Sequence, residues 1–315
     1  MTKTKKIAVQ MDPIESIDPN TDSTFVLALE AQKRGYIVFH YLPENLSLQN
    51  GVLTARAQSM LLSEEKGSHY TLGVHEVIDL NKIEVVLMRQ DPPFDMAYIT
   101  ATHMLDHVHP NTLVVNDPTS VRNAPEKLFA TLYPDLMPPT IVTSDTEQIK
   151  DFRDKYGDII VKPLYGNGGA GVFHLSPEDK NLNALLEIFK ERSKEPVMVQ
   201  AFIQDVKKGD KRIILIDGEP VGAINRVPPA GDVRANMHAG GKPLKTTLTK
   251  RDLEICETIG PELKYRGLIF TGIDVIGDYL TEINVTSPTG IQEINLFDKV
   301  KLESQFWDTI ESKLS

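Results

Sequence analysis

Hydrophobic residues in the first 120 positions recur in short runs, separated by polar stretches and by segments with helical spacing. Four runs rich in Val, Ile and Leu predict buried β-strands: residues 6–11, 36–42, 83–89 and 112–116. Asp22 or Ser23 can cap a helix after the first strand. That helix is expected to end near Arg34, with Gly35 as its stop. A second helix is expected over 97–108. This order of elements predicts an open, mostly parallel α/β domain.

The pattern changes after residue 122. Within 123–133 a helix is expected after Pro125, and another is expected over 181–194. Strands are expected at 158–164, 171–175, 196–203, 211–218 and 219–227. Most of the connections between these strands are too short for crossover helices, which favours antiparallel pairs. We therefore expect an α/β domain over residues 1–122 and an α+β domain over 123–315. Within the first domain, Asn50-Gly51 predicts a small hairpin.

Near the C-terminus, TGIDVIGDYLTEINVTSPTG places acidic residues among Ile and Val at 271–290. The run predicts a hairpin that turns at Gly277-Asp278 and brings Asp274 near Glu282 and Asn284. Glu282 and Asn284 share a face, because side chains alternate along a strand. Two carboxylates and an amide oxygen suit Mg²⁺. A half-buried strand with a solvated polar face is an equally weighted alternative.

The segment YGNGGAG, residues 165–171, matches G-x-G-x-x-G. A dinucleotide site would need a helix directly after it, but VFHL predicts a strand, so we reject that interpretation. What remains is a hairpin loop whose backbone N–H groups can approach an oxyanion. Lys162, at the end of the preceding strand, would pair with a phosphate oxygen. A plain flexible turn beside a lysine that extends to solvent explains the segment equally well.

Composition narrows the class of protein. The net charge of −10 argues against broad binding to nucleic acid or to a membrane surface, since both favour a basic face. The single cysteine, Cys256, cannot form an internal disulfide and fits a reducing compartment. The N-terminal segment lacks the apolar core of a signal peptide, and no apolar run approaches membrane-spanning length. We therefore expect a cytoplasmic protein.

A family resemblance emerges from the order of several segments. The chain resembles the ATP-grasp ligases in the order of five segments: EKLF with Lys127, IVKPLYGNGG, QAFIQDV, GDKRIILIDGEPVGAINR and GIDVIGDYLTEINVTSP. The chain more closely resembles the bacterial glutathione synthetases. Three of its segments are similar to that family's N-terminal segments: MDPIESIDPNTDSTFVLALEAQKRGY, LMRQDPPFD and NDPTSVRNAPEKLF. RVPPAGDVRANMHAGG is similar to its mobile active-site loop. The resemblance covers nearly the whole chain.

The resemblance implies a reaction and an architecture. ATP would phosphorylate the cysteinyl carboxylate of γ-glutamylcysteine, and the amine of glycine would attack the acyl phosphate to give glutathione, ADP and phosphate. The first domain would bind substrate, and the ATP-grasp domain would carry a lid subdomain at about residues 130–200. The small-molecule partners would be ATP, γ-glutamylcysteine and glycine. The metal would be Mg²⁺, with Mn²⁺ as an alternative, and the assembly a homotetramer.

The resemblance also implies a role for each candidate residue. The residues that would bind ATP are Lys127, Lys162, Gly166, Asn167, Gly168, Gly169, Gln200, Ala201, Phe202, Ile203 and Asp210. The metal ligands would be Asp274, Glu282 and Asn284. Those that would hold a carboxylate or the transferring phosphoryl group, or close over them, are Arg212, Arg226, Arg234, Asn236, Gly240 and Gly241. Those assigned to the dipeptide or glycine are Asp12, Ser23, Arg89 and Ser287.

Two other functions fit the same segments. One is another ATP-grasp ligase that joins a different acid and amine, which only substrate tests distinguish. The other is a nucleotide-binding regulator without catalysis, which would bind ATP but release no ADP in response to an acceptor. Asp274, Glu282 and Asn284 together argue against a regulator, because a protein that only binds nucleotide needs fewer metal ligands. Arg234 has a simpler alternative as a solvated loop charge.

Overall fold

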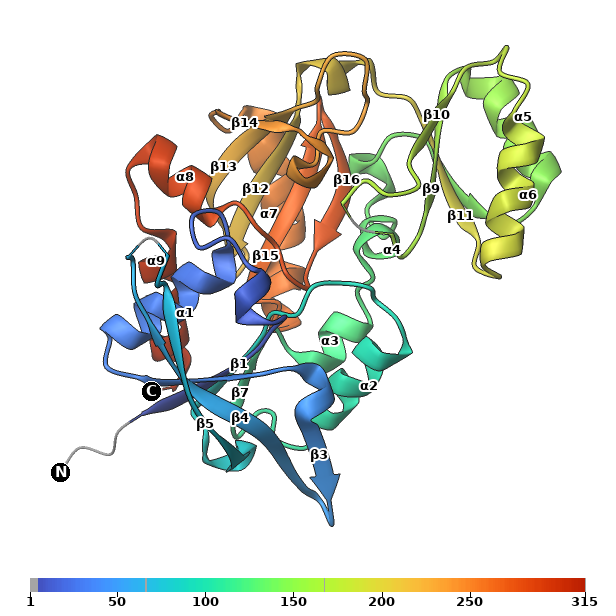
Figure 1. The fold of residues 1–315 in the computed structure, drawn as a ribbon. Helices are drawn as coiled ribbons and strands as arrows, with labels where there is room; N and C mark the ends of the chain where they lie inside the picture. Colours follow the sequence, from blue (N-terminus) through green and yellow to red (C-terminus); the bar gives the residue numbers. More distant parts are fainter. Residues whose placement is uncertain (1–4, 66, 167, 315) are drawn as a thin grey trace.

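The computed structural model describes residues 5–65, 67–166 and 168–314. Its strands form three sheets, of seven, four and five strands (Figure 1). The sheets follow one another along the chain, and the four-stranded sheet stands at one end of the molecule. Both expected kinds of domain are present: a mainly parallel α/β unit comes first, and antiparallel sheets follow.

The first sheet has the order β3-β4-β2-β1-β6-β7, with β5 paired to β4. Its parallel centre is the predicted one, with β1, β2, β6 and β7 side by side. The strands are β1 (Lys6–Gln10), β2 (Ile37–Tyr41), β3 (Leu46–Gln49), β4 (Val52–Leu62), β5 (Tyr70–Asp79), β6 (Val85–Met88) and β7 (Leu113–Val115). The helices of this unit are α1 (Ser23–Lys33), α2 (Met96–Leu105) and α3 (Pro118–Arg122).

The predicted hairpin at Asn50-Gly51 is confirmed as the turn between β3 and β4. Both turn residues have positive φ, 52° and 82°, which is the conformation that an Asn-Gly hairpin turn requires. The long β4–β5 ribbon that follows was not predicted. Both faces of β5 are largely exposed, so its sequence carries little of the alternation that marks a half-buried strand.

The four-stranded sheet has the order β10-β9-β11-β8, and two helices cover one of its faces (Figure 1). Its elements are β8 (Thr140–Thr143), α5 (Thr146–Tyr156), β9 (Ile159–Pro163), β10 (Phe173–Leu175), α6 (Leu182–Arg192) and β11 (Val197–Ala201). The predicted hairpin around the glycine segment is confirmed by the antiparallel pairing of β9 with β10. One face of this sheet buries a hydrophobic cluster against α5 and α6, while Met198 of β11 packs from the other face into the larger core of the protein.

The five-stranded sheet has the order β14-β13-β12-β15-β16 and is entirely antiparallel. Its strands are β12 (Asp210–Ile216), β13 (Glu219–Val227), β14 (Lys242–Lys245), β15 (Phe270–Ile276) and β16 (Tyr279–Asn284). The accompanying helices are α4 (Glu126–Ala130), α7 (Lys250–Tyr265), α8 (Ile291–Asp298) and α9 (Leu302–Leu314). The helix expected after Pro125 is confirmed at its start, but it is shorter than expected, because α4 ends at Ala130 and turns follow it.

The first and third sheets are joined through buried contacts. Asn116, just after β7, donates from Nδ2 to the carbonyl oxygens of Phe270 and Val285 at 2.8 and 2.7 Å. Its Oδ1 accepts from the Phe270 N–H at 2.8 Å. At the other side, α9 packs on α1, and the Trp307 indole N–H donates to the Leu27 carbonyl at 2.7 Å. The C-terminal helix thus anchors the third sheet to the first.

We predict that Asn116→Ala lowers the free energy of unfolding by about 2–4 kcal/mol, because it leaves three buried backbone groups without partners. Urea unfolding followed by circular dichroism would measure the change. Asn123→Ala, which removes an exposed amide a few residues further on, is the matched control and should stay within about 0.5 kcal/mol of wild type. Equal stability of the two variants would contradict this account of how the sheets are joined.

Candidate active site

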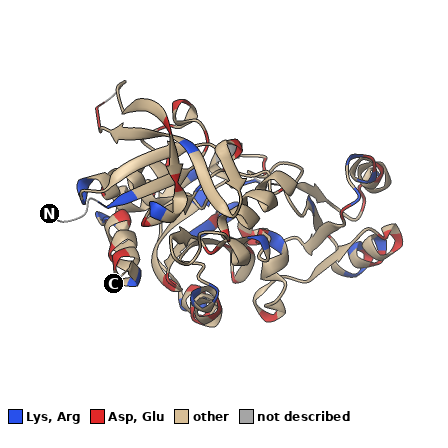
Figure 2. Ribbon diagram, turned by 90° about the horizontal axis from the view of Figure 1, so that it is seen from below, with Lys and Arg blue, Asp and Glu red and all other residues tan. Residues whose placement is uncertain are grey.

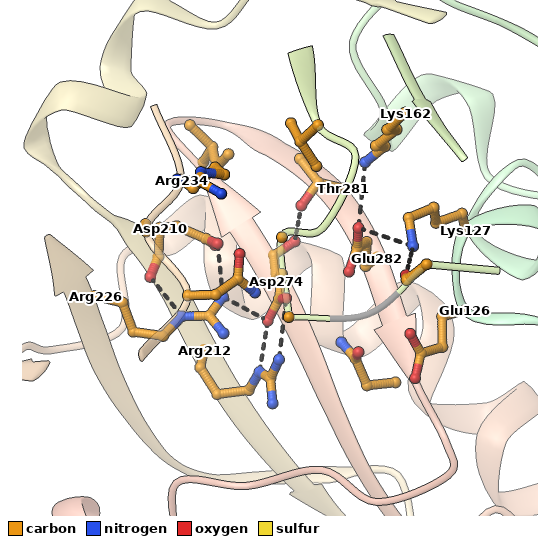
Figure 3. A pocket seen from close by; sticks show the side chains of 18 of the residues that line it. Glu126, Lys127, Lys162, Asp210, Arg212, Arg226, Arg234, Asp274, Thr281 and Glu282 are labelled. Carbon is orange, nitrogen blue, oxygen red and sulfur yellow. Dashed lines mark hydrogen bonds and ion pairs between the residues drawn. The ribbon is translucent and has the colours of Figure 1, made fainter. Parts of the chain in front are cut away.

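A cavity of about 190 Å³ lies between the five-stranded sheet, the four-stranded sheet and the segment that begins at Asp91 (Figure 3). The candidate residues that line it are Lys127, Lys162, Gly166, Gly168, Gly169, Gln200, Ala201, Phe202, Ile203, Asp210, Arg212, Arg226, Arg234, Asn236, Asp274, Glu282, Asn284 and Ser287. Those that do not line it are Asp12, Ser23, Arg89, Gly240 and Gly241. Asn167 lies outside the described residues.

The register of β15 and β16 puts the candidate metal ligands on one face. Asp274 pairs with Glu282 across the two strands, and Asn284 pairs with Gly272 one step further. The hairpin predicted at 273–285 is therefore confirmed, including the approach of Asp274 to Glu282. On the other side of β15, Asp274 pairs with Arg212 of β12. Neighbouring strands thus bring opposite charges together without any long connection.

Asp274 is the centre of a buried charge network. Arg212 donates to both of its carboxylate oxygens, at 2.5 Å from Nε and 3.0 Å from Nη2. Arg226 Nη2 lies 3.0 Å from Asp274 and 2.6 Å from Asp210 (Figure 3). Burial alone would raise the pKa of Asp274, but Arg212 and Arg226 hold it below its ordinary value. Burial and the nearby charge of Asp274 raise the pKa of Asp210, despite its contact with Arg226.

Glu282 is the second anchor and is held by two lysines. Its Oε1 lies 3.3 Å from Lys162 Nζ and 3.7 Å from Lys127 Nζ (Figure 3). Burial opposes ionisation of Glu282, but the two ammonium groups lower its pKa. Burial also lowers the pKa of Lys162, although Glu282 partly offsets this. Lys127 in addition donates to the Gly166 carbonyl at 2.6 Å, which ties the glycine segment to the start of α4.

The glycine segment meets the loop between β13 and β14 over the cavity. Gly169 has a φ of 81°, and a Cβ built on it would lie 3.0 Å from Asn236 Oδ1. Gly241 would bring a Cβ to 1.9 Å from the Ala235 carbonyl oxygen, so no larger residue fits there without a backbone shift. Gly240 and Gly241 therefore shape the β13–β14 loop from outside the cavity. Arg234 in this loop is bound to Asp232 at 2.7 Å.

The end of β11 forms the wall expected to meet adenine. Gln200, Ala201, Phe202 and Ile203 line the cavity in succession. Two of their backbone N–H groups are already bonded, Ala201 to the Pro139 carbonyl and Phe202 to the Asp158 carbonyl, both at 2.9 Å. The Phe202 ring stacks on His174, with centroids 4.1 Å apart. Contacts to the four-stranded sheet thus fix this wall.

The candidate substrate residues of the first domain lie behind another wall, the segment 287–291. Arg89 donates from Nε to Thr24 and from Nη2 to the Pro288 carbonyl, both at 3.0 Å. Ser23 Oγ accepts from the N–H groups of Gly290 and Ile291 at 3.2 and 3.4 Å. These residues position the wall. Their contact with substrate stays a prediction.

Asp12 does not line the cavity, but it binds Asp91, which does. Its Oδ2 accepts from the Asp91 N–H at 2.7 Å, and Asp91 lines the cavity. Burial is the main cause of a raised pKa for Asp12, and the charge of Asp91 adds to it. Ser287 is the candidate substrate residue that does line the cavity, and its hydroxyl donates to the Arg89 carbonyl at 3.2 Å.

Sequence reasoning missed Glu126. It begins α4, where an acidic residue ordinarily favours the helix N-terminus, so no sequence signal separated it from a surface glutamate. The structure places it on the cavity, where Oε1 accepts from the Thr286 hydroxyl at 3.0 Å. Burial, with the charge of Glu282 as the next cause, raises the pKa of Glu126 from 4.5 to about 7.

The donor set of Asp274, Glu282 and Asn284 fits a hard divalent cation. All three line one cavity, and their oxygen donors are the ligands that Mg²⁺ prefers. Asn284 Nδ2 donates to the Gly272 carbonyl at 3.1 Å, which leaves its Oδ1 as the amide's ligating atom. Within the described ranges, no group of three or more His, Cys, Asp and Glu side chains is placed to hold a metal. The site therefore depends on the amide, and a bound nucleotide would have to complete the coordination.

Comparisons with known proteins agree with this geometry. Residues 6–122 match the model of the prokaryotic glutathione synthetase N-terminal domain, and residues 126–299 match that of the prokaryotic glutathione synthetase ATP-grasp domain. The glutathione synthetase of Brucella melitensis is 59% identical over 98% of this chain and 99% of its own.

Solved structures share the fold. The D-cycloserine synthetase DcsG has a TM-score of 0.69 at 14% identity, over 98% of this chain and 100% of its own. The ATP-grasp ligase PsnB, complexed with a precursor variant, Mg and ADP, has a TM-score of 0.62 at 18% identity, over 99% of each chain. Fold and cavity thus define an ATP-grasp ligase, an ATP-dependent enzyme. Within that class, the chain belongs to the prokaryotic glutathione synthetase family.

Two further observations concern partners. Across the described residues, no helix combines the length and the apolar character that crossing a bilayer requires. Lys and Arg are interspersed with Asp and Glu along the ribbon (Figure 2). The expectation that the chain binds neither nucleic acid nor membrane stays a prediction.

We predict that Glu126→Gln stabilises the ligand-free protein increasingly as pH rises. The pKa of Glu126 is raised in the fold, so wild type loses stability as pH rises from about 4.5 to 7 and the buried carboxyl must ionise. The Gln side chain does not ionise, so the variant does not lose stability in this way. The difference in free energy of unfolding should be small near pH 5 and grow to at most about 3 kcal/mol by pH 8.

Thermal unfolding at several pH values measures this difference. Glu147→Gln, which removes an exposed carboxylate from α5, is the control for the loss of one negative charge. If the gap between Glu126→Gln and wild type stayed constant from pH 5 to 8, the Glu126 carboxyl would not titrate as described.

Proposed function

We propose that this protein ligates γ-glutamylcysteine to glycine, with cleavage of ATP to ADP and phosphate. The observation that carries the proposal is the convergence of Asp274, Glu282 and Asn284 with Lys127 and Lys162 on one cavity. A phosphoryl-transfer site needs cations for the phosphates and oxygen ligands for a metal, and both sets are present. The choice of substrates rests on the family to which the chain belongs.

The first chemical step is phosphoryl transfer. A carboxylate oxygen of the dipeptide attacks the γ-phosphorus, the bond to the β–γ bridging oxygen breaks, and ADP leaves. Lys127 and Lys162 are placed to exchange their contact with Glu282 for phosphate oxygens. Mg²⁺, held by Asp274, Glu282 and Asn284, would neutralise charge on the phosphates when bound. Arg212 and Arg226 offer planar guanidinium groups beside the same carboxylates for the substrate or the transferred group.

The second step is aminolysis. The glycine ammonium first loses one proton to water, and the nitrogen of the free amine then attacks the acyl carbon. The carbon–oxygen bond to phosphate breaks, and the second proton lost by the nitrogen leaves with phosphate. Water must be excluded in the interval, because it would hydrolyse the acyl phosphate. Gly168, Gly169 and Asn236 come from the two segments that meet over the cavity. We propose that these segments close during the reaction, with Arg234 turning from Asp232 to the phosphates.

Three finer assignments stay predictions. They are a cytoplasmic location, a homotetramer and the ability of Mn²⁺ to replace Mg²⁺. The location is supported by the single cysteine, Cys256, which is buried. The tetramer is supported by family resemblance alone.

We predict that ADP release with Mg-ATP and γ-glutamylcysteine depends on glycine, and that the product has the mass of glutathione. A coupled assay for ADP together with mass spectrometry provides the test. ADP release that requires a different acceptor or acid would leave the ligase class intact and overturn the substrates. Tight ATP binding without turnover for any pair would favour a regulator.

We predict that Glu282→Gln lowers kcat/KM for ATP by at least about 100-fold and raises the Mg²⁺ concentration needed for half-maximal rate. The amide of the variant carries no negative charge to bind Mg²⁺. It also leaves Lys127 and Lys162 without the anion that both contact. Glu219→Gln, an exposed change on the same sheet, is the control and should stay within about twofold of wild type. Unaltered turnover and Mg²⁺ dependence in a folded Glu282→Gln enzyme would remove Glu282 from the metal site.

A further inference from the structure

Glu126 lines the cavity, and the reaction above assigns it no role. It lies on the same side of the cavity as Lys127 and Glu282 (Figure 3). Its helix, α4, packs against β16, the strand that carries Glu282 and Asn284. Glu126 therefore lies on an element packed against the strand that carries two of the proposed metal ligands, and it lines the same cavity as they do.

Within the described part of the chain, Glu126 differs from the neighbouring carboxylates because no Lys or Arg side chain forms an ion pair with it. Asp210 and Asp274 contact arginines, and Glu282 contacts lysines. Among the residues that the structure describes, Glu126 forms no ion pair, and its polar contact is the Thr286 hydroxyl. The adjacent Lys127 directs its ammonium group to Glu282 and the Gly166 carbonyl instead.

A buried carboxylate without a counter-cation is costly, and a cationic ligand group would remove that cost. The raised pKa of Glu126, caused mainly by burial, agrees with this reasoning. The carboxyl group thus points to a positively charged part of a substrate.

Two ammonium groups belong to the substrates of the proposed reaction, which this inference takes as its basis. The α-ammonium of γ-glutamylcysteine lies at the far end of the dipeptide from the carboxylate that reacts. The ammonium of the acceptor must come to the reacting carbon itself. Because Glu126 lies beside Glu282 and Asn284, its position matches the acceptor's ammonium rather than the dipeptide's.

We propose that the Glu126 carboxylate binds the ammonium group of the acceptor amino acid and orients its nitrogen toward the acyl carbon. Thr286 holds the carboxylate in place through its hydroxyl. The acceptor subsite is then formed by α4 and the segment that follows β16, opposite the adenine wall at the end of β11.

Glu126→Gln tests the proposal, because the amide keeps the size of the side chain and can still accept from Thr286. At saturating ATP and γ-glutamylcysteine, kcat/KM for glycine should fall by about tenfold or more, mainly through KM. The KM values for ATP and γ-glutamylcysteine should change by less than about twofold. Hydroxylamine, a small nucleophile that is uncharged at neutral pH, serves as the second acceptor. Its hydroxamate yield per ADP should be retained.

Controls separate the possible failures. Wild-type enzyme that gives no glycine-dependent ADP release would overturn the proposed function itself. With an active wild type, an unchanged KM for glycine in Glu126→Gln would overturn the acceptor subsite. Equal losses with glycine and with hydroxylamine would also overturn it, since they would show a general effect on the site. Glu147→Gln, an exposed change on α5, should match wild type in every constant.

Discussion

The pairing of buried charges across neighbouring strands is the constraint on which the rest of this structure depends. Arg212, Asp274 and Glu282 are successive cross-strand neighbours in β12, β15 and β16. Buried cations are costly on their own, and neighbouring carboxylates repel one another. In the ligand-free protein, the cations and the carboxylates stabilise each other. Breaking one member therefore leaves an unpaired buried charge and affects binding, catalysis and stability together.

The position of this network follows from how the three sheets are joined. Asn116 fastens the first sheet to the backbone of Phe270 and Val285, on either side of the β15–β16 hairpin. Arg89 and Ser23 hold the segment after β16 from behind. The four-stranded sheet, in contrast, packs one face against its own two helices and supplies the glycine segment and the end of β11 to the cavity. The third sheet is thus fixed to the first, and the cavity lies between it and the four-stranded sheet.

Sequence patterns predicted the parts whose chemistry is local. The sequence predicted the hairpin that joins Asp274 to Glu282 and the glycine turn between two strands, because strand alternation and glycine are local signals. The β4–β5 ribbon was not predicted, since both faces of β5 are largely exposed. Likewise, no rule of sequence spacing shows that Arg89 binds the Pro288 carbonyl instead of lining the cavity, or that Glu126 lines the cavity. Those facts depend on contacts between residues more than 150 positions apart.

The central claim is that a carboxylate is activated by phosphorylation in this cavity. The most direct test uses γ-glutamylcysteine labelled with ¹⁸O in its cysteinyl carboxylate, with ATP, Mg²⁺ and glycine. An acyl phosphate requires that one carboxylate oxygen ends in inorganic phosphate, so mass spectrometry should find one ¹⁸O in the phosphate for each fully labelled dipeptide consumed. Phosphate without ¹⁸O, formed together with product, would contradict the account.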